Sequence, residues 1–233
     1  MEKNRIFFLN GNALKLLALI SMTVDHIGYH LYPSLEILRI IGRISFPIFA
    51  YMIAEGCYYT RNKEKHLGMI WGVALICQVV MSIANGNLEM CVLVTLALSV
   101  TMIYFIDKAI EKRGWIPILI ALLTSLVIVF IPTVLPAVLK EQGFVIDFGI
   151  FGVLLPVAVR YAKSRPLKLI ACTVCIILLC LTTTLPTRWY HLLALIPLAL
   201  YNGERGKLRL KYLFYAYYPV HIVVIIAIKS LLS

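Results

Sequence analysis

The stretch LKLLALISMTVDHIGYHLYP, residues 14–33, decides the fold class of this chain. It is an apolar run of about the 20 residues that a helix needs to cross a bilayer, yet it contains a lysine, an aspartate and two histidines. A second run, LRIIGRISFPIFAYMIAEG (38–56), adds two arginines and a glutamate. Charged groups are costly inside a membrane, so these two runs bear on function as well as on fold.

The composition extends this interpretation to the whole chain. The 233 residues are 61% hydrophobic and only 14% charged, with a mean hydropathy of +0.91. A soluble domain has about 25% charged residues. Apolar runs recur along the whole length, and they are too long for the strands of a membrane barrel. We therefore predict an all-α, polytopic transmembrane helical bundle that forms a single domain over residues 1–233, embedded in the lipid bilayer of the cytoplasmic membrane.

Nine spans are expected, and the charges between them predict their orientation. The expected spans are 13–32, 35–58, 67–84, 90–107, 115–138, 145–162, 168–185, 189–201 and 212–231, of which 189–201 is short for a crossing helix. Sixteen Lys and Arg residues lie on one side of this arrangement, at Lys3 and Arg5 and within 61–66, 107–114, 160–168 and 202–211. The other side has only Lys140, Arg188 and Lys229. The positive-inside rule then places the N-terminus in the cytoplasm and the C-terminus outside.

The same distribution argues against two other interpretations. The net charge of +11 could suggest a nucleic-acid-binding protein, but the basic residues lie between apolar spans, so no nucleic acid partner is expected. The first apolar run exceeds the length of a signal-peptide core and has no small-residue cleavage site, so a cleaved signal peptide is not expected. The six cysteines lie in or beside apolar spans, which favours packing over a metal site, and no metal is predicted.

The ionisable residues of the first two spans form the candidate site. Asp25 and His26 lie in the outer half of the first span, and Lys15 lies eleven residues before His26, on the same helix face. Arg39 and Arg43 are four residues apart on the next span, where they reach a similar depth. We expect the two arginines, the imidazole and the carboxylate to share one polar pocket.

Further polar residues in or beside the spans are expected to support this pocket. They are Glu55, Tyr59, Asp147 and His221, the last just after Pro219 in YAYYPVHI (215–222).

This set of groups fits two kinds of chemistry. A histidine beside a carboxylate is a general base for an attacking hydroxyl or amine, with Asp25 orienting His26 or setting its protonation. Desolvated arginines such as Arg39 and Arg43 suit an anionic donor or a developing oxyanion. The combination fits acyl transfer, and it fits ion-coupled transport almost as well, because proton relays use the same residue types.

At these residues the sequence resembles the TraX family. The matching stretches are residues 14–33, LRIIGRISFPIFAYMIAEGCYYTRN (38–62), LVTLALSV (93–100) and YAYYPVHI (215–222). The namesake resembles an integral membrane acetyltransferase that N-acetylates a pilin subunit. The family is also similar to the membrane acyltransferase type 3 proteins, whose first span carries a basic residue, ten others and a catalytic histidine, as Lys15 and His26 do here. Their arginine motif on a following span is similar to Arg39 and Arg43.

The resemblance implies transfer of an acyl group, in particular acetyl from acetyl-CoA, to an acceptor at the outer face. The acceptor would be a pilin N-terminus, another peptide amine or a glycan hydroxyl, and the cytoplasmic basic loops would suit the phosphates of acyl-CoA. Two alternatives stay open. One is a small proton- or anion-coupled transporter, and the other is a non-catalytic assembly factor for a surface structure, in which the polar cluster would be structural.

Overall fold

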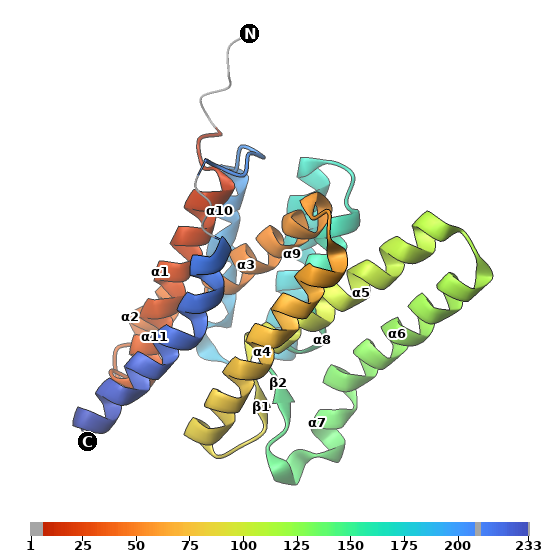
Figure 1. Ribbon diagram of the computed structural model, residues 1–233. Helices are drawn as coiled ribbons and strands as arrows, with labels where there is room; N and C mark the ends of the chain where they lie inside the picture. Colours follow the sequence, from red (N-terminus) through yellow and green to blue (C-terminus); the bar gives the residue numbers. More distant parts are fainter. Residues whose placement is uncertain (1–6, 208–210, 233) are drawn as a thin grey trace. The chain divides into compact units, whose positions relative to one another are not determined.

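A computed structural model describes residues 7–207 and 211–232, and nearly all of its regular structure is helical (Figure 1). The elements are α1 (Gly11–His30), α2 (Glu36–Gly42), α3 (Ser45–Tyr59), α4 (Lys63–Asn85), β1 (Glu89–Met90), α5 (Val92–Lys112), α6 (Trp115–Thr133), α7 (Leu135–Val138), the 3₁₀ helix η1 (Lys140–Gln142), β2 (Val145–Ile146), α8 (Gly149–Tyr161), α9 (Arg165–Thr182), the 3₁₀ helix η2 (Pro186–Ala194), α10 (Leu195–Ala199) and α11 (Lys211–Leu232). The prediction of an all-α fold is confirmed, apart from the two short strands.

Six helical segments are long and apolar enough to cross a membrane within the described residues. They are Glu36–Tyr59, Lys63–Ile83, Val92–Lys112, Trp115–Thr133, Arg165–Thr182 and Leu213–Leu232. This supports a multi-pass membrane protein. The helix α1 has 20 residues but is not among the six, because its polar side chains lower its hydropathy.

The remaining predicted spans differ from full crossing helices. The span expected at 145–162 is helical only over the 13 residues of α8, about 20 Å at 1.5 Å per residue. The span expected at 189–201 is the end of η2 followed by the five residues of α10. The count of nine and the orientation stay predictions. Lys3, Arg5 and Arg209, which the charge argument uses, lie outside the described residues.

The chain divides into two compact units, which are described separately. The first unit consists of the residues up to Met52 together with those from Ile176 onward, and the second is Ile53–Cys175. The helices α3 and α9 each run through a boundary of this division. The prediction of a single domain is therefore neither confirmed nor contradicted.

In the first unit, α1 and α2 form an antiparallel pair, and α11 lies beside α1 (Figure 1). Asn10 caps α1, because its side chain accepts a hydrogen bond from the Ala13 N–H at 3.0 Å. The backbone before α1 is paired with the segment after α10, through Leu9 and Tyr201. The helices α1 and α11 run in the same direction, since Thr23 contacts Tyr217 and His26 contacts His221. An odd number of spans requires this parallel arrangement.

In the second unit, α5 is the central helix and contacts α4, α6 and α8 (Figure 1). Its buried face includes Thr95 and Ser99, whose hydroxyls donate to the backbone carbonyls of Asp147 and Val153. These bonds satisfy the polar groups that α5 places in the core. The strands β1 and β2 pair in parallel and lie in the connections before α5 and α8.

Candidate functional site

The first unit contains a charged cluster in which the carboxylate of Asp25 on α1 faces two arginines. Arg39 Nη1 lies 2.6 Å from one carboxylate oxygen, and Arg43 Nη2 lies 3.5 Å from the other. Arg39 also donates to the Asp25 backbone carbonyl at 3.3 Å. Arg43 is buried, whereas Arg39 has 23% of its side chain exposed. Arg39 is therefore the more accessible cation of the pair.

Two glycines bring α1 and α2 close enough for this contact. A Cβ at Gly42 would overlap the Asp25 side chain, and a Cβ at Gly28 would lie 2.7 Å from the Leu38 Cβ. Any side chain at position 42 would therefore displace the carboxylate. The sequence thus provides, through Gly42, the space that the Asp25 side chain occupies.

The break between α2 and α3 exposes backbone carbonyls that side chains then satisfy. Ser45 Oγ donates to the Gly42 carbonyl at 2.8 Å, and His191 Nδ1 lies 2.6 Å from the Arg43 carbonyl. A carbonyl only accepts, so the proton in this second bond is on His191 Nδ1. The buried His191 of η2 therefore fixes the backbone next to Arg43.

The imidazole of His26 contacts α11 rather than the Asp25 carboxylate. Its Nδ1 lies 2.7 Å from Nε2 of His221, whose own Nδ1 lies 2.9 Å from the Tyr217 carbonyl. The ring of Tyr218 packs edge-on against both imidazoles, at centroid distances of 6.4 and 5.3 Å. His221 is buried. The sequence predicts that His221 supports the polar pocket, and the structure places it in direct contact with His26.

The expected contact between Asp25 and His26 is not found among the described contacts. Successive helix residues are about 100° apart around the axis, so their side chains leave α1 in different directions. Asp25 faces α2, and His26 faces α11. The polar residues of α1 therefore form two adjoining groups, a charged one and an imidazole one. The described hydrogen-bond partner that can orient the His26 imidazole is therefore His221.

Lys15 and His26 lie on one face of α1, as their spacing predicts. The Lys15 ammonium lies 5.9 Å from the centroid of the Phe214 ring on α11, the helix that also carries His221. A cation over an aromatic ring is a favourable electrostatic contact.

The other three predicted residues belong to the second unit. Glu55 is buried and pairs with Lys168 of α9. Tyr59 is 65% exposed at the end of α3, where its ring contacts that of Tyr58. Asp147 follows β2, and its backbone carbonyl accepts from Thr95 Oγ1 at 2.6 Å. Their described contacts fit local structural roles.

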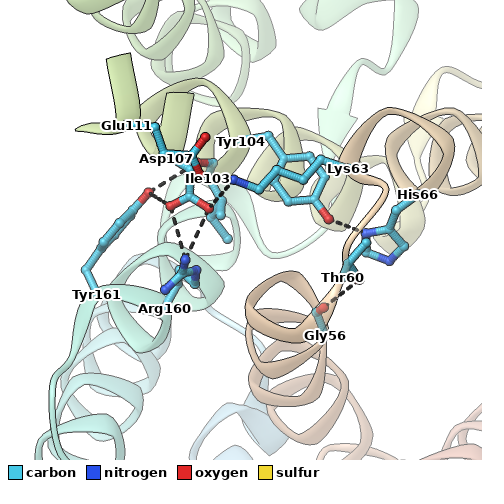
Figure 2. A network of polar contacts seen from close by, with 10 residues as sticks. All are labelled: Gly56, Thr60, Lys63, His66, Ile103, Tyr104, Asp107, Glu111, Arg160 and Tyr161. Carbon is cyan, nitrogen blue, oxygen red and sulfur yellow. Dashed lines mark hydrogen bonds and ion pairs between the residues drawn. The ribbon is translucent and has the colours of Figure 1, made fainter. Parts of the chain in front are cut away.

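The second unit has a charged cluster of its own, around the buried carboxylate of Asp107 on α5 (Figure 2). Arg160 Nη2 lies 3.2 and 3.1 Å from its two oxygens, and the Tyr161 hydroxyl donates at 3.0 Å. Lys63, at the start of α4, lies 3.5 Å from Asp107 and 2.5 Å from Glu111. The cluster joins α4, α5 and α8, and its two cations face two carboxylates.

Sequence reasoning missed the Asp107 cluster and the position of His191. Asp107 and Arg160 were assigned to cytoplasmic loops, but α5 continues to Lys112 and α8 to Tyr161, so both residues are helical. The available signal is Asp107 at the end of an apolar run, one turn before Glu111 in DKAIEKRG (107–114). No pattern in the sequence linked His191 to Arg43, because they are 148 residues apart.

Comparisons with known proteins identify a family for this chain. The family model described as "TraX protein" matches residues 10–229. The chain is 25% identical over 250 aligned positions to the "Probable fimbrial assembly protein FimC, serogroup H1" of Dichelobacter nodosus, covering 94% of this chain and 96% of that protein. It is 50% identical over 62 residues to "Uncharacterized protein RP591" of Rickettsia prowazekii (strain Madrid E), a match over 27% of this chain and 24% of that protein.

No solved structure matches the chain. The family match covers most of the length, including both residue groups of α1 and their partners on α2 and α11. The chain belongs to the TraX family.

Proposed function

We propose that the protein is an integral membrane acyltransferase that moves an acyl group, in particular acetyl from cytoplasmic acetyl-CoA, to an amine or hydroxyl at the outer face. The observation that carries the proposal is the arrangement on α1. The His26 imidazole is held through one nitrogen by His221, and the neighbouring residue, Asp25, holds Arg39 and Arg43. A general base and a cationic group that stabilises the oxyanion both contribute to acyl transfer, and here α1 carries the base and the carboxylate that holds the cations.

The chemistry follows from these groups. As the acceptor nitrogen or oxygen bonds to the thioester carbonyl carbon, Nε2 of His26 takes its proton. The carbonyl oxygen becomes an oxyanion, and Arg39 stabilises it electrostatically. The carbon–sulfur bond then breaks, and the leaving thiolate takes the proton from the His26 imidazolium, which gives free CoA and the acylated acceptor. Removing such a general base costs about 100- to 10,000-fold in rate.

Arg39 suits the oxyanion role because it retains donor capacity. Its described bonds to Asp25 use Nη1, and a guanidinium carries five N–H donors. Asp25 fixes the orientation of the guanidinium, which a preorganised electrostatic group requires. Lys15, further along the same face of α1, would contact the anionic donor on its path to His26. Basic residues in the loops would bind the phosphates of CoA.

The acceptor class is supported by the name of the Dichelobacter relative, which describes a fimbrial assembly protein. A pilin-like peptide N-terminus is therefore the first acceptor to test, followed by a surface glycan. The same name supports a second candidate function, a non-catalytic factor for fimbrial assembly. In that case the charges of the first unit would only hold α1 and α2 together, and no acyl group would be transferred.

Mass spectrometry of surface peptides and glycans separates the two functions. Cells with the wild-type gene, without it, and with His26→Ala are compared for acylated species. Acyl transfer predicts an acyl mass that is lost both in the deletion and in His26→Ala. His66→Ala is the matched control, because His66 is a buried histidine of the second unit that bonds the Tyr104 hydroxyl at 2.5 Å.

An assembly defect without any lost acyl mass would favour the non-catalytic function. Purified protein then provides the direct test. Release of free CoA from acetyl-CoA with the identified acceptor should disappear in His26→Ala, and wild-type turnover in that variant would exclude the assigned base.

A further inference from the structure

We infer that His221 of α11 is a positioning residue that fixes the tautomer of His26, so that its Nε2 is the basic nitrogen. The catalytic role of His221 rests on the proposed function, whereas the tautomer of His26 follows from the hydrogen bonds alone. Three groups form a chain from α1 into α11: the His26 imidazole, the His221 imidazole and the Tyr217 backbone carbonyl.

The direction of each bond follows from the end of the chain. A backbone carbonyl has no proton to donate, so His221 Nδ1 donates to the Tyr217 carbonyl across 2.9 Å. In a neutral His221 ring the other nitrogen, Nε2, is then an acceptor. His26 Nδ1 lies 2.7 Å from that nitrogen and must donate to it. A neutral His26 therefore carries its proton on Nδ1 and has its lone pair on Nε2.

Burial and packing support a neutral pair in the resting protein. His221 is 5% exposed, and the two imidazole rings are nearly parallel, at 13°, with their centroids 5.0 Å apart. Two positive charges at that separation in a poorly hydrated interior would repel strongly. The pair therefore has room for one additional proton, which is the proton that a general base takes up.

The bond keeps its direction when His26 becomes charged. An imidazolium donates from both nitrogens, so His26 Nδ1 continues to donate to His221 Nε2, now as a charge-assisted bond. His221 thus stabilises the charged form of His26 without moving. The aspartate of a serine protease triad has the same effect on its histidine. In this protein a second histidine would take that part, because Asp25 is engaged by the arginines.

A second contact holds the two helices in register at this level. Thr23 Oγ1 donates to the Leu19 carbonyl at 2.9 Å, so the Tyr217 hydroxyl, 2.8 Å from Thr23 Oγ1, is the donor in that bond. Thr23 is one turn before His26, and Tyr217 is one turn before His221. This contact anchors the Tyr217 side chain to α1, and the Tyr217 backbone carbonyl accepts the bond from His221.

The test combines a tautomer measurement with kinetics. Protein with ¹⁵N-labelled histidine rings is compared for the wild type, His221→Leu and His221→Gln, and the His26 signals are assigned with His26→Ala. The wild type should show a protonated Nδ1 and an unprotonated Nε2 at His26. His221→Leu removes the acceptor, so the two tautomers should become mixed. His221→Gln offers a side-chain oxygen to His26 Nδ1 and should retain the wild-type tautomer.

In the acyl-transfer assay, His221→Leu should lower kcat at least tenfold with little change in KM, and His221→Gln should restore most of that loss. Val223→Ala is the control and should leave kcat unchanged, because Val223 is an exposed residue of α11 that takes no part in the described bonds of this chain of groups.

A protonated Nε2 at His26 in the wild type, or an unchanged tautomer in His221→Leu, would overturn the inference. An intact kcat in His221→Leu would also overturn it. The tautomer measurement needs no activity, so absence of acyl transfer would remove the proposed function and leave the assigned tautomer standing. If His221→Leu mixes the His26 tautomers but keeps wild-type turnover that depends on His26, the catalytic role assigned to His221 is wrong and the proposed function stands.

Discussion

Each of the two charged clusters is built around one aspartate that faces two basic residues, and the clusters differ in the groups next to these charges. Asp25 in the first unit faces Arg39 and Arg43, and Asp107 in the second unit faces Arg160 and Lys63. Around Asp107 the charges compensate one another, with Tyr161 and Glu111 as further partners. Beside Asp25, the next residue on α1 is a histidine bonded through one nitrogen.

This difference separates a structural cluster from a candidate reactive one. Buried charge by itself indicates only that partners exist, because an unpaired buried charge is too costly to keep. Reactivity requires a group whose partners leave a lone pair or a donor for a substrate. In the first unit the His26 imidazole meets this criterion, because its described bond uses one ring nitrogen and leaves the other for a substrate, so we take this unit as the candidate site. The described contacts of the Asp107 cluster join three helices. The predictions below test this distinction.

Removing the central carboxylate in each cluster should give the largest effects. Asp25→Asn removes the carboxylate that faces Arg39 and Arg43, and Asp107→Asn removes the one that faces Arg160; breaking a buried ion pair costs about 3–5 kcal/mol. The free energy of unfolding in detergent should therefore fall in both variants. Only Asp25→Asn should also lower acyl transfer per folded molecule, by at least tenfold, because Arg39 loses its anchor. Turnover measured on the folded fraction checks this.

Glu111→Gln is the matched control for the second unit. Its partner Lys63 is 31% exposed and Glu111 itself is 64% exposed, so the change should cost about 1 kcal/mol or less. If Asp107→Asn lowered turnover as much as Asp25→Asn at equal stability, the distinction between the clusters would be wrong.

The fold could be predicted from the sequence because hydropathy dominates in a membrane. Long apolar runs must become helices, and α4, α5 and α9 begin or end within a few residues of the expected spans. Where polar residues interrupt a run, the prediction lost accuracy. The span expected at 189–201 is a 3₁₀ segment and a short helix, since local geometry there depends on packing.

The site could be predicted only as a set of residue types. Ionisable side chains are costly in lipid, which identified Asp25, His26, Arg39 and Arg43 as unusual. The four-residue spacing of the two arginines placed these two on one helix face. It could not show that Asp25 and His26 point to different helices. That choice depends on contacts with α11, about 190 residues further along the chain, and no local pattern encodes it.

Glycine substitutions give the next largest effect and compare the helix packing of the two units. In Gly42→Ala the new Cβ overlaps the Asp25 side chain, and overpacking of this kind costs about 1–3 kcal/mol. Gly72→Ala in α4 is the same change where nothing lies within 4 Å of the new Cβ. Thermal unfolding should show a lower midpoint for Gly42→Ala and no decrease for Gly72→Ala. Equal midpoints would contradict the close packing of α1 on α2.

The bond from His191 to the helix break should have a smaller effect. His191→Phe removes the donor to the Arg43 carbonyl and leaves that acceptor buried, at a cost of about 1–3 kcal/mol. Arg43 should then be held less firmly, so turnover should fall severalfold. Tyr190→Phe changes the exposed neighbour and should match the wild type. A His191→Phe protein with normal stability would show that the break needs no side-chain donor.

The smallest expected effect concerns Tyr59, which the sequence marks as a supporting residue of the site. Its side chain is 65% exposed at the end of α3, and its described ring contact is with Tyr58. Surface substitutions away from special features change stability by about 0.5 kcal/mol or less. Tyr59→Phe should therefore leave both the unfolding midpoint and the acyl-transfer rate within about twofold of the wild type. A clear loss of turnover in this variant would mean that the second unit contributes a hydroxyl to the reaction, and the division between a reactive and a structural cluster would no longer hold.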